Sequence, residues 1–299
     1  MNQEALVKWK NYFNQNNSQR IKEIFDYNLS NSKNLRALFM TQGKDVYNYI
    51  AICLELLQSY FLITDDIMDN SVLRRGKLCW YKKVGYKAIK DAYFLLSLIF
   101  KTINEHERIS GEKLEHKNEI IKSFFEANFY TCLGQTEDTV KKELNNYNDI
   151  LDTYTSEKYE RIVKYKTSYY TTYLPLKLRY ILNNCSFTQE VHNFAFLLGY
   201  FMQVQDDFLN FCPETSGKSG TDVEEKKVTY YSCKLIKSID DVIACEYFIK
   251  SNFEFIKPYF LSLIQNYDKE EEELYNQLLF YKDLEEFDFI MKIVYKRRK

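Results

Sequence analysis

Residues 51–69 read AICLELLQSYFLITDDIMD, a long apolar run that ends in three aspartates. Apolar residues recur three and four positions apart over residues 47–68, which predicts a helix buried on nearly every side. If this helix continues, Asp65 and Asp69 lie one turn apart on one face, with their Cβ atoms about 5–6 Å apart. Alone, such a cluster is more often a solvated helix end than a site. Because these carboxylates emerge from a core helix, they need a cation to balance their charge. Oxygen ligands of this kind suit Mg²⁺ that is shared with substrate phosphates.

A second acidic cluster, Asp206 and Asp207, repeats this form. It too lies at the end of an apolar run, residues 190–211, that predicts a helix. Two helix-borne acidic clusters that face each other across a bundle would hold a diphosphate through bridging metal ions. One cluster is weak evidence for a site, whereas two clusters of the same form, each after an apolar helix, are strong evidence.

The composition favours an all-α fold. The 299 residues are 45% hydrophobic but include only eight glycines and three prolines. β-Sandwiches, barrels and Rossmann sheets need many turns rich in these residues, so they are poorly supported. Further helices are predicted over residues 91–103, 119–133 and 233–249, with loops or helix ends at 28–34, 70–77, 142–148, 183–188, 213–227 and 266–272. No linker rich in glycine or serine divides the chain, so we expect a single all-helical domain over residues 1–299.

Charge and hydropathy exclude several classes of protein. The formal net charge is −1, with 41 Lys and Arg against 42 Asp and Glu, so the sequence has no basic footprint for a nucleic acid. No apolar run approaches the roughly 20 residues that span a bilayer, and the start MNQEALVKWK has no apolar signal core. We therefore expect a cytoplasmic protein without a membrane span. None of the three histidines, His106, His116 and His192, stands beside a Ser or Cys in a recognisable nucleophile arrangement, so triad chemistry is unsupported.

Basic side chains are available to hold diphosphates, with Arg as a bidentate fork and Lys as a point charge. Each of them alone is more often a solvated surface residue. The candidates are Lys33, Arg36, Arg74, Arg75, Lys166, Lys218, Lys227 and the tail, residues 296–299. Gly217-Lys218 is not a P-loop, because Cys212 stands where the first glycine of that motif is required.

Several motifs together resemble those of eukaryotic farnesyl diphosphate synthases, which belong to the trans-isoprenyl diphosphate synthase or polyprenyl synthetase family. The string DDIMD at 65–69, followed by RRG at 74–76, is similar to the first aspartate-rich motif of that family. Further strings match in family order: ELLQ at 55–58, GQTED at 134–138, YKT at 165–167, YLP at 173–175, QVQDDFL at 203–209, GKSGTD at 217–222 and YKRRK at 295–299. The resemblance covers the chain from about Tyr27 to its last residue.

The resemblance implies an isoprenoid synthase helical bundle with a central active-site cavity, which acts as a homodimer in isoprenoid and sterol biosynthesis. The implied reaction condenses isopentenyl diphosphate with dimethylallyl and geranyl diphosphate to give farnesyl diphosphate. Mg²⁺, as three ions and with Mn²⁺ as an alternative, would assist ionisation of the allylic diphosphate. The double bond of isopentenyl diphosphate then attacks the allylic cation, and a proton is lost to the released diphosphate. A dry, closed site is needed because water would quench the cation.

The resemblance also implies roles for individual residues. The expected metal ligands are Asp65, Asp69 and Asp206, supported by Asp66 and Asp207. The expected allylic diphosphate site comprises Arg74, Lys166 and Lys218, lined by Gln135, Asp138, Thr167 and Gln203, with Lys227 as a further substrate-binding residue. The expected ligands of isopentenyl diphosphate are Lys33, Arg36, Gln58 and Arg75, over which the basic tail with Arg298 closes. The residues expected to be catalytic are Asp65, Asp69, Asp206, Lys166, Thr167 and Gln203.

Product length follows from where the growing tail can go. It should extend through the apolar interior along the helix that carries Asp65, so side chains one turn earlier form its floor. Those side chains are Tyr60 and Phe61. Two aromatic residues there resemble the pattern of farnesyl-length enzymes, and they are equally compatible with ordinary core packing.

Five residues depart from the family pattern, and two alternative activities stay open. Asn31-Ser32 replaces Gly-Gly, Ala37 replaces Gly, Met202 replaces an aromatic residue and Asn210 replaces Asp. A terpene synthase of the same fold would ionise an allylic diphosphate without an acceptor, and a geranyl diphosphate synthase would stop one step earlier. A non-catalytic partner subunit is a third reading, which the intact first acidic motif disfavours.

Overall fold

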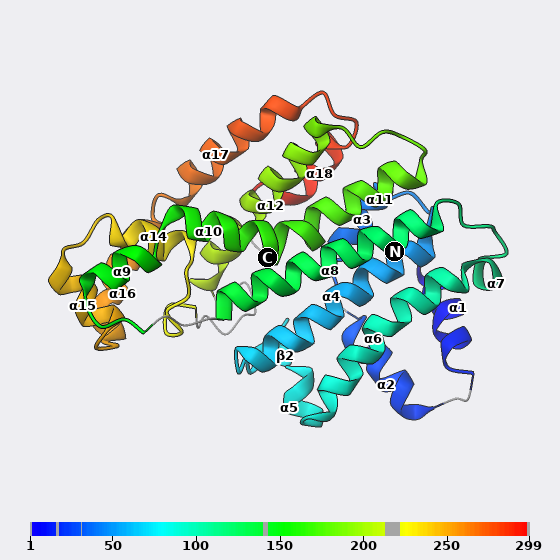
Figure 1. Cartoon of the computed structure of the whole chain (residues 1–299), viewed down its shortest axis with the longest axis horizontal. Helices are drawn as coiled ribbons and strands as arrows, with labels where there is room; N and C mark the ends of the chain where they lie inside the picture. The colour runs from blue at the N-terminus through cyan, green and yellow to red at the C-terminus, as the bar shows by residue number, and fades with distance from the viewer. Residues whose placement is uncertain (1, 16–17, 31, 140–142, 213–221, 298–299) are drawn as a thin grey trace. The chain divides into compact units, whose positions relative to one another are not determined.

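The computed structural model describes residues 2–15, 18–30, 32–139, 143–212 and 222–297. Helices make up nearly all of the regular structure in these ranges, and one hairpin of two very short strands accompanies them (Figure 1). The prediction of an all-α fold is therefore confirmed. None of the described helices combines the length and apolar character that crossing a lipid bilayer requires.

The chain forms two compact units, and the boundary between them falls inside three long helices. The first unit takes in the residues up to Phe129 and Tyr170–His192, and the second takes in Tyr130–Tyr169 and the residues from Asn193 onward. The three helices are α8 (Lys117–Thr139), the π-helix η1 (Val163–Tyr173) and α12 (Gln189–Asn210). That the units act together as one domain stays a prediction.

The first unit is built around the helix that opened the sequence analysis. Its elements are α1 (Gln3–Phe13), α2 (Gln19–Asn28), α3 (Leu35–Thr41), α4 (Asn48–Met68), β1 (Leu73–Arg74), β2 (Lys77–Leu78), α5 (Trp80–Val84), α6 (Lys87–Asn104), α7 (His106–Ser110) and α11 (Leu174–Leu182). Helix α4 packs along α6, and its side chains from Tyr49 to Ser59 are all buried. Full burial of one leucine or isoleucine stabilises the fold by about 1.5–3 kcal/mol, so α4 is the rigid base for the side chains at its end.

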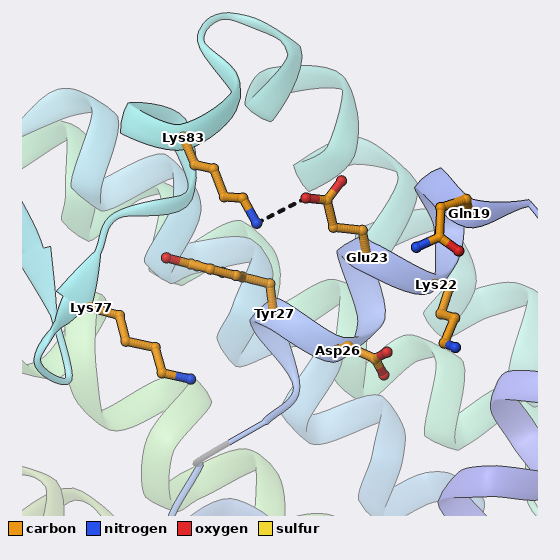
Figure 2. A pocket seen from close by; sticks show the side chains of 7 residues that line it. All are labelled: Gln19, Lys22, Glu23, Asp26, Tyr27, Lys77 and Lys83. Atoms are coloured by element: carbon orange, nitrogen blue, oxygen red, sulfur yellow. Dashed lines mark ion pairs between the residues drawn. The ribbon is translucent and has the colours of Figure 1, made fainter.

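Helix α4 ends where the acidic motif ends. Asp69 is its C-cap residue, and the Asp69 N–H still donates to the Asp65 carbonyl oxygen at 2.9 Å. Asn70 follows in the left-handed region with a φ of 50°. Next comes the hairpin of β1 and β2, whose two-residue turn is Arg75-Gly76. An open pocket of ≈ 260 Å³ is lined by residues of α2 together with Lys77 of β2 and Lys83 of α5 (Figure 2).

The second unit has a separate apolar core. Its remaining elements are α9 (Tyr147–Thr153), α10 (Ser156–Ile162), α14 (Tyr230–Ile236), α15 (Asp241–Phe248), α16 (Phe253–Ile264), α17 (Tyr267–Leu278), the 3₁₀ turn η2 (Leu279–Tyr281) and α18 (Phe287–Val294). The core gathers aromatic side chains such as Tyr231, Tyr247 and Phe260. It positions α12, which carries the second acidic cluster at its end.

One helix prediction in this unit is wrong. The helix expected over residues 233–249 is two helices, because Asp240 caps α15 by accepting a hydrogen bond from the Ile243 N–H at 2.9 Å. The polar segment 266–272, expected to be a loop or a helix end, is the N-terminal end of α17, with Asn266 as the N-cap. Acidic residues are favourable in a first helical turn because they complement the helix dipole, so its polarity does not indicate a loop.

Candidate active site

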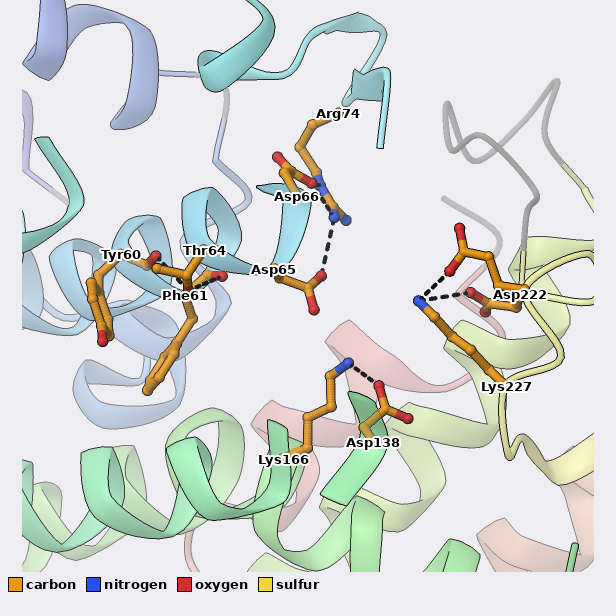
Figure 3. A network of polar contacts seen from close by, with 11 residues as sticks. Tyr60, Phe61, Thr64, Asp65, Asp66, Arg74, Asp138, Lys166, Asp222 and Lys227 are labelled. Carbon is orange, nitrogen blue, oxygen red and sulfur yellow. Dashed lines mark hydrogen bonds and ion pairs between the residues drawn. The ribbon is translucent and has the colours of Figure 1, made fainter. Parts of the chain in front are cut away.

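The first acidic motif is neutralised by an arginine from the hairpin. Arg74 Nε donates to Asp66 Oδ1 at 2.9 Å, and Arg74 Nη2 donates to the same oxygen at 2.5 Å (Figure 3). Arg74 Nη2 also lies 3.3 Å from Asp65 Oδ2. Burial raises the pKa of Asp66, and the Arg74 charge opposes that rise. Since the Asp65 side chain is 22% exposed and that of Asp66 only 5%, Asp65 is the better placed of the two to meet a cation.

The hairpin turn places two arginines side by side at the cost of backbone strain. Arg75 and Gly76 both have positive φ, 53° and 73°, as in the mirror-image turns that suit two-residue hairpins. An arginine in this region is unusual, and such strain costs about 1–3 kcal/mol and clusters at functional sites. Desolvation lowers the pKa of Arg75, and the charges of Arg36 and Arg74 lower it further, while Glu55 opposes them.

A polar cluster lies at the start of α3, around the buried Arg36. Arg36 Nη2 donates to Thr171 Oγ1 at 2.7 Å, and its guanidinium lies 4.3 Å from the centre of the Tyr170 ring. Glu55 is buried on α4, where it accepts from Ser32 Oγ at 2.8 Å and from the Ala37 N–H at 3.3 Å. Ala37 therefore fits α3 in place of the expected glycine, and its amide orients Glu55.

Several buried polar atoms of this unit have no hydrogen-bond partner among the described residues, and Arg36 Nε and Gln58 Oε1 are two of them. Buried polar atoms are nearly always paired, so each unpaired one needs an explanation such as a missing ligand. Both atoms belong to residues that the sequence assigns to isopentenyl diphosphate. The structure thus brings Arg36, Arg75 and Glu55 within electrostatic reach of one another, and Gln58 lies one helical turn beyond Glu55 on α4. Lys33 lies in the described segment just before α3.

The expected floor residues lie one turn before Asp65. The Tyr60 and Phe61 rings are 5.0 Å apart, and the Phe61 ring is 5.0 Å from that of Tyr170. Thr64 Oγ1 donates to the carbonyl oxygens of Tyr60 and Phe61, at 3.2 and 3.0 Å (Figure 3). These contacts fix the helical turn that separates the aromatic pair from the acidic motif.

In the second unit, the lysine and threonine of the YKT motif lie on the π-helix η1. Lys166 Nζ pairs with Asp138 Oδ2 at 2.5 Å (Figure 3). Thr167 Oγ1 donates to Gln203 Oε1 at 2.6 Å. A Cβ atom added to Gly134 would collide with the backbone nitrogen of Lys166, so this glycine lets α8 approach η1 closely. The sequence did not predict a π-helix, although π geometry is frequent at functional sites.

The second acidic cluster divides into an inner and an outer carboxylate. Asp207 is buried and accepts from Gln203 Nε2 and from the Tyr230 N–H, both at 2.8 Å. Burial raises the pKa of Asp207 to about 7, although these two hydrogen bonds act in the opposite direction. Asp206 is only partly buried. Asp206 is therefore better placed to bind a metal, whereas Asp207 holds Gln203 and the start of α14.

Other predicted residues have different surroundings. Lys227 pairs with Glu225 at 3.2 Å and Asp222 at 3.5 Å, and the Asn210 side-chain oxygen accepts from the Asp222 N–H at 3.3 Å. Asn210 thus anchors the loop in place of the expected aspartate. Gln135 lies on α8, one turn before Asp138. Asn31, Lys218 and Arg298 lie outside the described residues.

The base of the basic tail is tied to α12 by residues to which the sequence analysis gave no role. Gln205 Nε2 donates to Glu271 Oε1 at 2.8 Å and to the Val294 carbonyl oxygen at 2.7 Å. The Lys296 N–H donates to Glu271 Oε1 at 3.2 Å. Gln205 stands inside the QVQDDFL motif, but nothing in the sequence pattern pairs it with Glu271.

Within the described ranges, no set of three or more His, Cys, Asp or Glu side chains converges to hold a metal. Asp65 and Asp69 belong to the first unit and Asp206 to the second. These carboxylates at helix ends fit Mg²⁺, which binds through one or two carboxylates together with substrate phosphates and water.

Comparison with known proteins gives a consistent result. The family model described as polyprenyl synthetase matches residues 18–253. Farnesyl pyrophosphate synthases of Bos taurus and Mus musculus are each 34% identical over 232 residues, which are 71% of this chain and 64% of each relative's own length. Farnesyl pyrophosphate synthase 2 of Arabidopsis thaliana is 33% identical over 75% of this chain and 70% of its own. A solved structure of T. brucei farnesyl diphosphate synthase with risedronate has a TM-score of 0.82 at 22% identity, over 99% of this chain and 97% of that one, which shows a shared fold.

Proposed function

The chain belongs to the polyprenyl synthetase family, and from this premise we propose that it condenses isopentenyl diphosphate with dimethylallyl and geranyl diphosphate to give farnesyl diphosphate. The chain spans a little under two thirds of the length of the bovine and mouse relatives, which carry the name of this activity. The observation that carries the proposal is the cluster at the start of α3. It offers two arginines, and Arg36 Nε is a buried donor without a partner among the described residues, as a second diphosphate requires.

The acidic residues would bind the allylic substrate through metal. Asp65, Asp69 and Asp206 would hold Mg²⁺, which when bound supplies positive charge to the leaving diphosphate. Asp66 holds Arg74 in place for the same diphosphate, and Asp207 holds Gln203. We infer three ions from the family resemblance, with Mn²⁺ as an alternative.

The residues on η1 would act on the charge that develops at the allylic carbon. The Thr167 hydroxyl proton is committed to Gln203, so its oxygen lone pairs are available to a cation. Lys166, held by Asp138, would bind the diphosphate that leaves. Fixed dipoles and charges of this kind stabilise a transition state because they need no reorganisation when charge develops. Lys33, Arg36, Gln58 and Arg75 would meanwhile hold isopentenyl diphosphate.

We further propose that the protein acts as a cytoplasmic homodimer. Support for a dimer comes from the exposed apolar side chains on α6 and α8, among them Tyr93 at 62% and Phe125 at 54% exposure. Exposed apolar side chains that gather on neighbouring helices often mark a protein interface. The Phe125 ring stacks on that of Phe100 at 4.4 Å, so this surface is already ordered in one protomer.

The test is the product profile of the purified protein. It is incubated with Mg²⁺, isopentenyl diphosphate and either dimethylallyl or geranyl diphosphate, with geranyl or farnesyl diphosphate alone as the control. Farnesyl diphosphate from both mixtures, with inert controls, is the expected result. Hydrocarbon or alcohol from a single substrate would instead show a terpene synthase, and products that stop at geranyl diphosphate would show a geranyl diphosphate synthase.

A further inference from the structure

The hairpin that carries Arg74 and Arg75 cannot be rigid by itself. Each of its strands has two residues, and its turn contains the strained Arg75. An isolated two-stranded hairpin is marginally stable at best in water. Contacts outside the hairpin must therefore determine where the two guanidinium groups stand.

One such contact is a buried charge cluster behind the hairpin. Trp80 begins α5, two residues after β2, and its indole Nε1 donates to Asp91 Oδ2 at 2.9 Å. The Asp91 side chain is completely buried on α6 and pairs with Arg20 Nη2 from α2 through the same oxygen. The Arg20 guanidinium also lies 4.9 Å from the centre of the Trp80 ring. One carboxylate thus joins α2, α5 and α6.

Tyr27 of α2 makes a second contact, directly to the hairpin. Its hydroxyl donates to the Leu78 carbonyl oxygen of β2 at 2.6 Å, and its ring lies 4.9 Å from that of Trp80. Lys83 pairs with Glu23 at 2.9 Å and lies 4.9 Å from the centre of the Tyr27 ring. Figure 2 shows Tyr27 and Lys83 along the wall of the surface pocket, with Lys77 of β2 nearby.

We propose that Trp80, Asp91, Arg20 and Tyr27, together called the hairpin bracket, are positioning residues that set the binding geometry of Arg74 and Arg75. Burial of a carboxylate is costly unless it is paired, and Asp91 Oδ1 has no partner among the described residues. The burial of Asp91 is therefore compensated only through its other oxygen, Oδ2, which accepts from Trp80 and Arg20. The inference rests on the proposed function, since it assigns the arginines to diphosphate.

The chain contains its own matched control. It has two tryptophans, and both donate the indole N–H to a buried side chain of α6. Trp9 of α1 donates to Thr102 Oγ1 at 2.8 Å, and its ring packs on Phe13 and Phe25, away from the hairpin. Trp80→Phe and Trp9→Phe each remove one buried indole hydrogen bond and a similar volume, but only Trp80→Phe alters the surroundings of the hairpin.

The experiment compares these two variants by calorimetric titration with isopentenyl diphosphate and with inorganic pyrophosphate plus Mg²⁺. Neither titration needs turnover, so the result stands even if condensation fails and the proposed function is wrong. We expect Trp80→Phe to raise Kd, and KM where turnover occurs, by about tenfold with kcat within a factor of about three, as the loss of one oriented contact predicts. Trp9→Phe should leave Kd unchanged. Equal Kd changes in the two variants, or none in either, would overturn the inference.

A second comparison separates positioning from general destabilisation. Asp91→Asn keeps an acceptor oxygen for the Trp80 indole and should hold Kd within about threefold, whereas Asp91→Leu should match Trp80→Phe. The double variant Trp80→Phe/Asp91→Leu should bind no more weakly than either single variant, because both remove the same contact. Additive effects on Kd would show that Trp80 and Asp91 act separately and would also overturn the inference.

Discussion

Arg74 gives both its Nε and Nη2 hydrogens to a single oxygen of Asp66, so the middle aspartate of the first motif is joined to an arginine of the hairpin. The two residues are eight positions apart, across the end of α4. Asp66 is therefore the partner within the protein of the Arg74 guanidinium, which is proposed to bind substrate. It also separates the roles within the motif, because the flanking Asp65 is the more exposed carboxylate.

Asp65→Ala should lower turnover by about 100-fold or more, since loss of a metal ligand removes several kcal/mol of transition-state stabilisation. Circular dichroism and melting temperature should change little, because Asp65 lies at the partly exposed end of α4. Asp26→Ala is the control, which removes an exposed carboxylate paired with Lys10. Activity of Asp65→Ala equal to that of the control would contradict the metal assignment.

Arg36→Lys should raise the KM for isopentenyl diphosphate by about tenfold, because lysine keeps the charge but loses the planar fork and the stacking on Tyr170. The KM for the allylic substrate should stay the same. Steady-state kinetics with each substrate varied in turn give the measurement. Arg108→Lys, at an exposed arginine of α7 that pairs with Glu105, is the matched control. An equal rise in both KM values would mean that Arg36 does not distinguish the two substrates.

Tyr60→Ala should lengthen the products, because it removes an aromatic side chain from the proposed floor. Chromatography of the dephosphorylated alcohols shows the chain length directly. Tyr86→Ala, at the exposed N-cap tyrosine of α6, controls for the loss of an aromatic ring. An unchanged product distribution would mean that the tail grows elsewhere.

Gly134→Ala should disturb η1, because the new methyl group meets the backbone of Lys166. Overpacking of this kind typically costs about 1–3 kcal/mol of stability. We expect a lower midpoint in urea together with reduced kcat, since Lys166 and Thr167 move with the backbone. Cys132→Ala alters an exposed position on the same helix and should change neither quantity. Wild-type kcat in Gly134→Ala would show that the placement of η1 is not critical.

His106 should make the protein less stable in mild acid. Burial lowers the pKa of His106 below its usual 6.5, although the hydrogen bond to the Glu112 carbonyl oxygen opposes this. Below about pH 6.5 the unfolded chain therefore binds a proton that the native state does not. The free energy of unfolding consequently decreases as the pH is lowered. Urea unfolding at pH 7.5 and 5.5 should show a smaller pH effect in His106→Asn than in the wild type. The exposed His116→Asn is the control, and equal pH effects in all three proteins would contradict this account.

The sequence was most informative where one chemical pattern dominates a segment. The unbroken apolar run of α4 predicted its extent to within a residue, and α6 and α12 were also located. The break at residues 237–240 was missed because the apolar pattern continues across it while Asp240 caps a new helix. The π-helix η1 was missed because no local sequence pattern signals π geometry, and Gly134 of α8, which lies against it, is distant in sequence.

The candidate site shows the same division. Carboxylates and arginines were found because they stand together in short strings that resemble a known family. The partners that hold them, such as Asp91 for Trp80 and Glu271 for Gln205, lie on other helices and leave no local pattern. Their identity depends on tertiary packing, which a single sequence does not reveal.

The left-handed turn at Arg75 sets stability and chemistry against each other at one position. Glycine or asparagine would adopt its φ of 53° with less strain, so either replacement should make the empty hairpin more stable. Either would also delete a cation from the proposed substrate site. A screen that selects variants for thermal resistance alone would therefore favour replacements at this residue that keep the fold and lose the proposed activity.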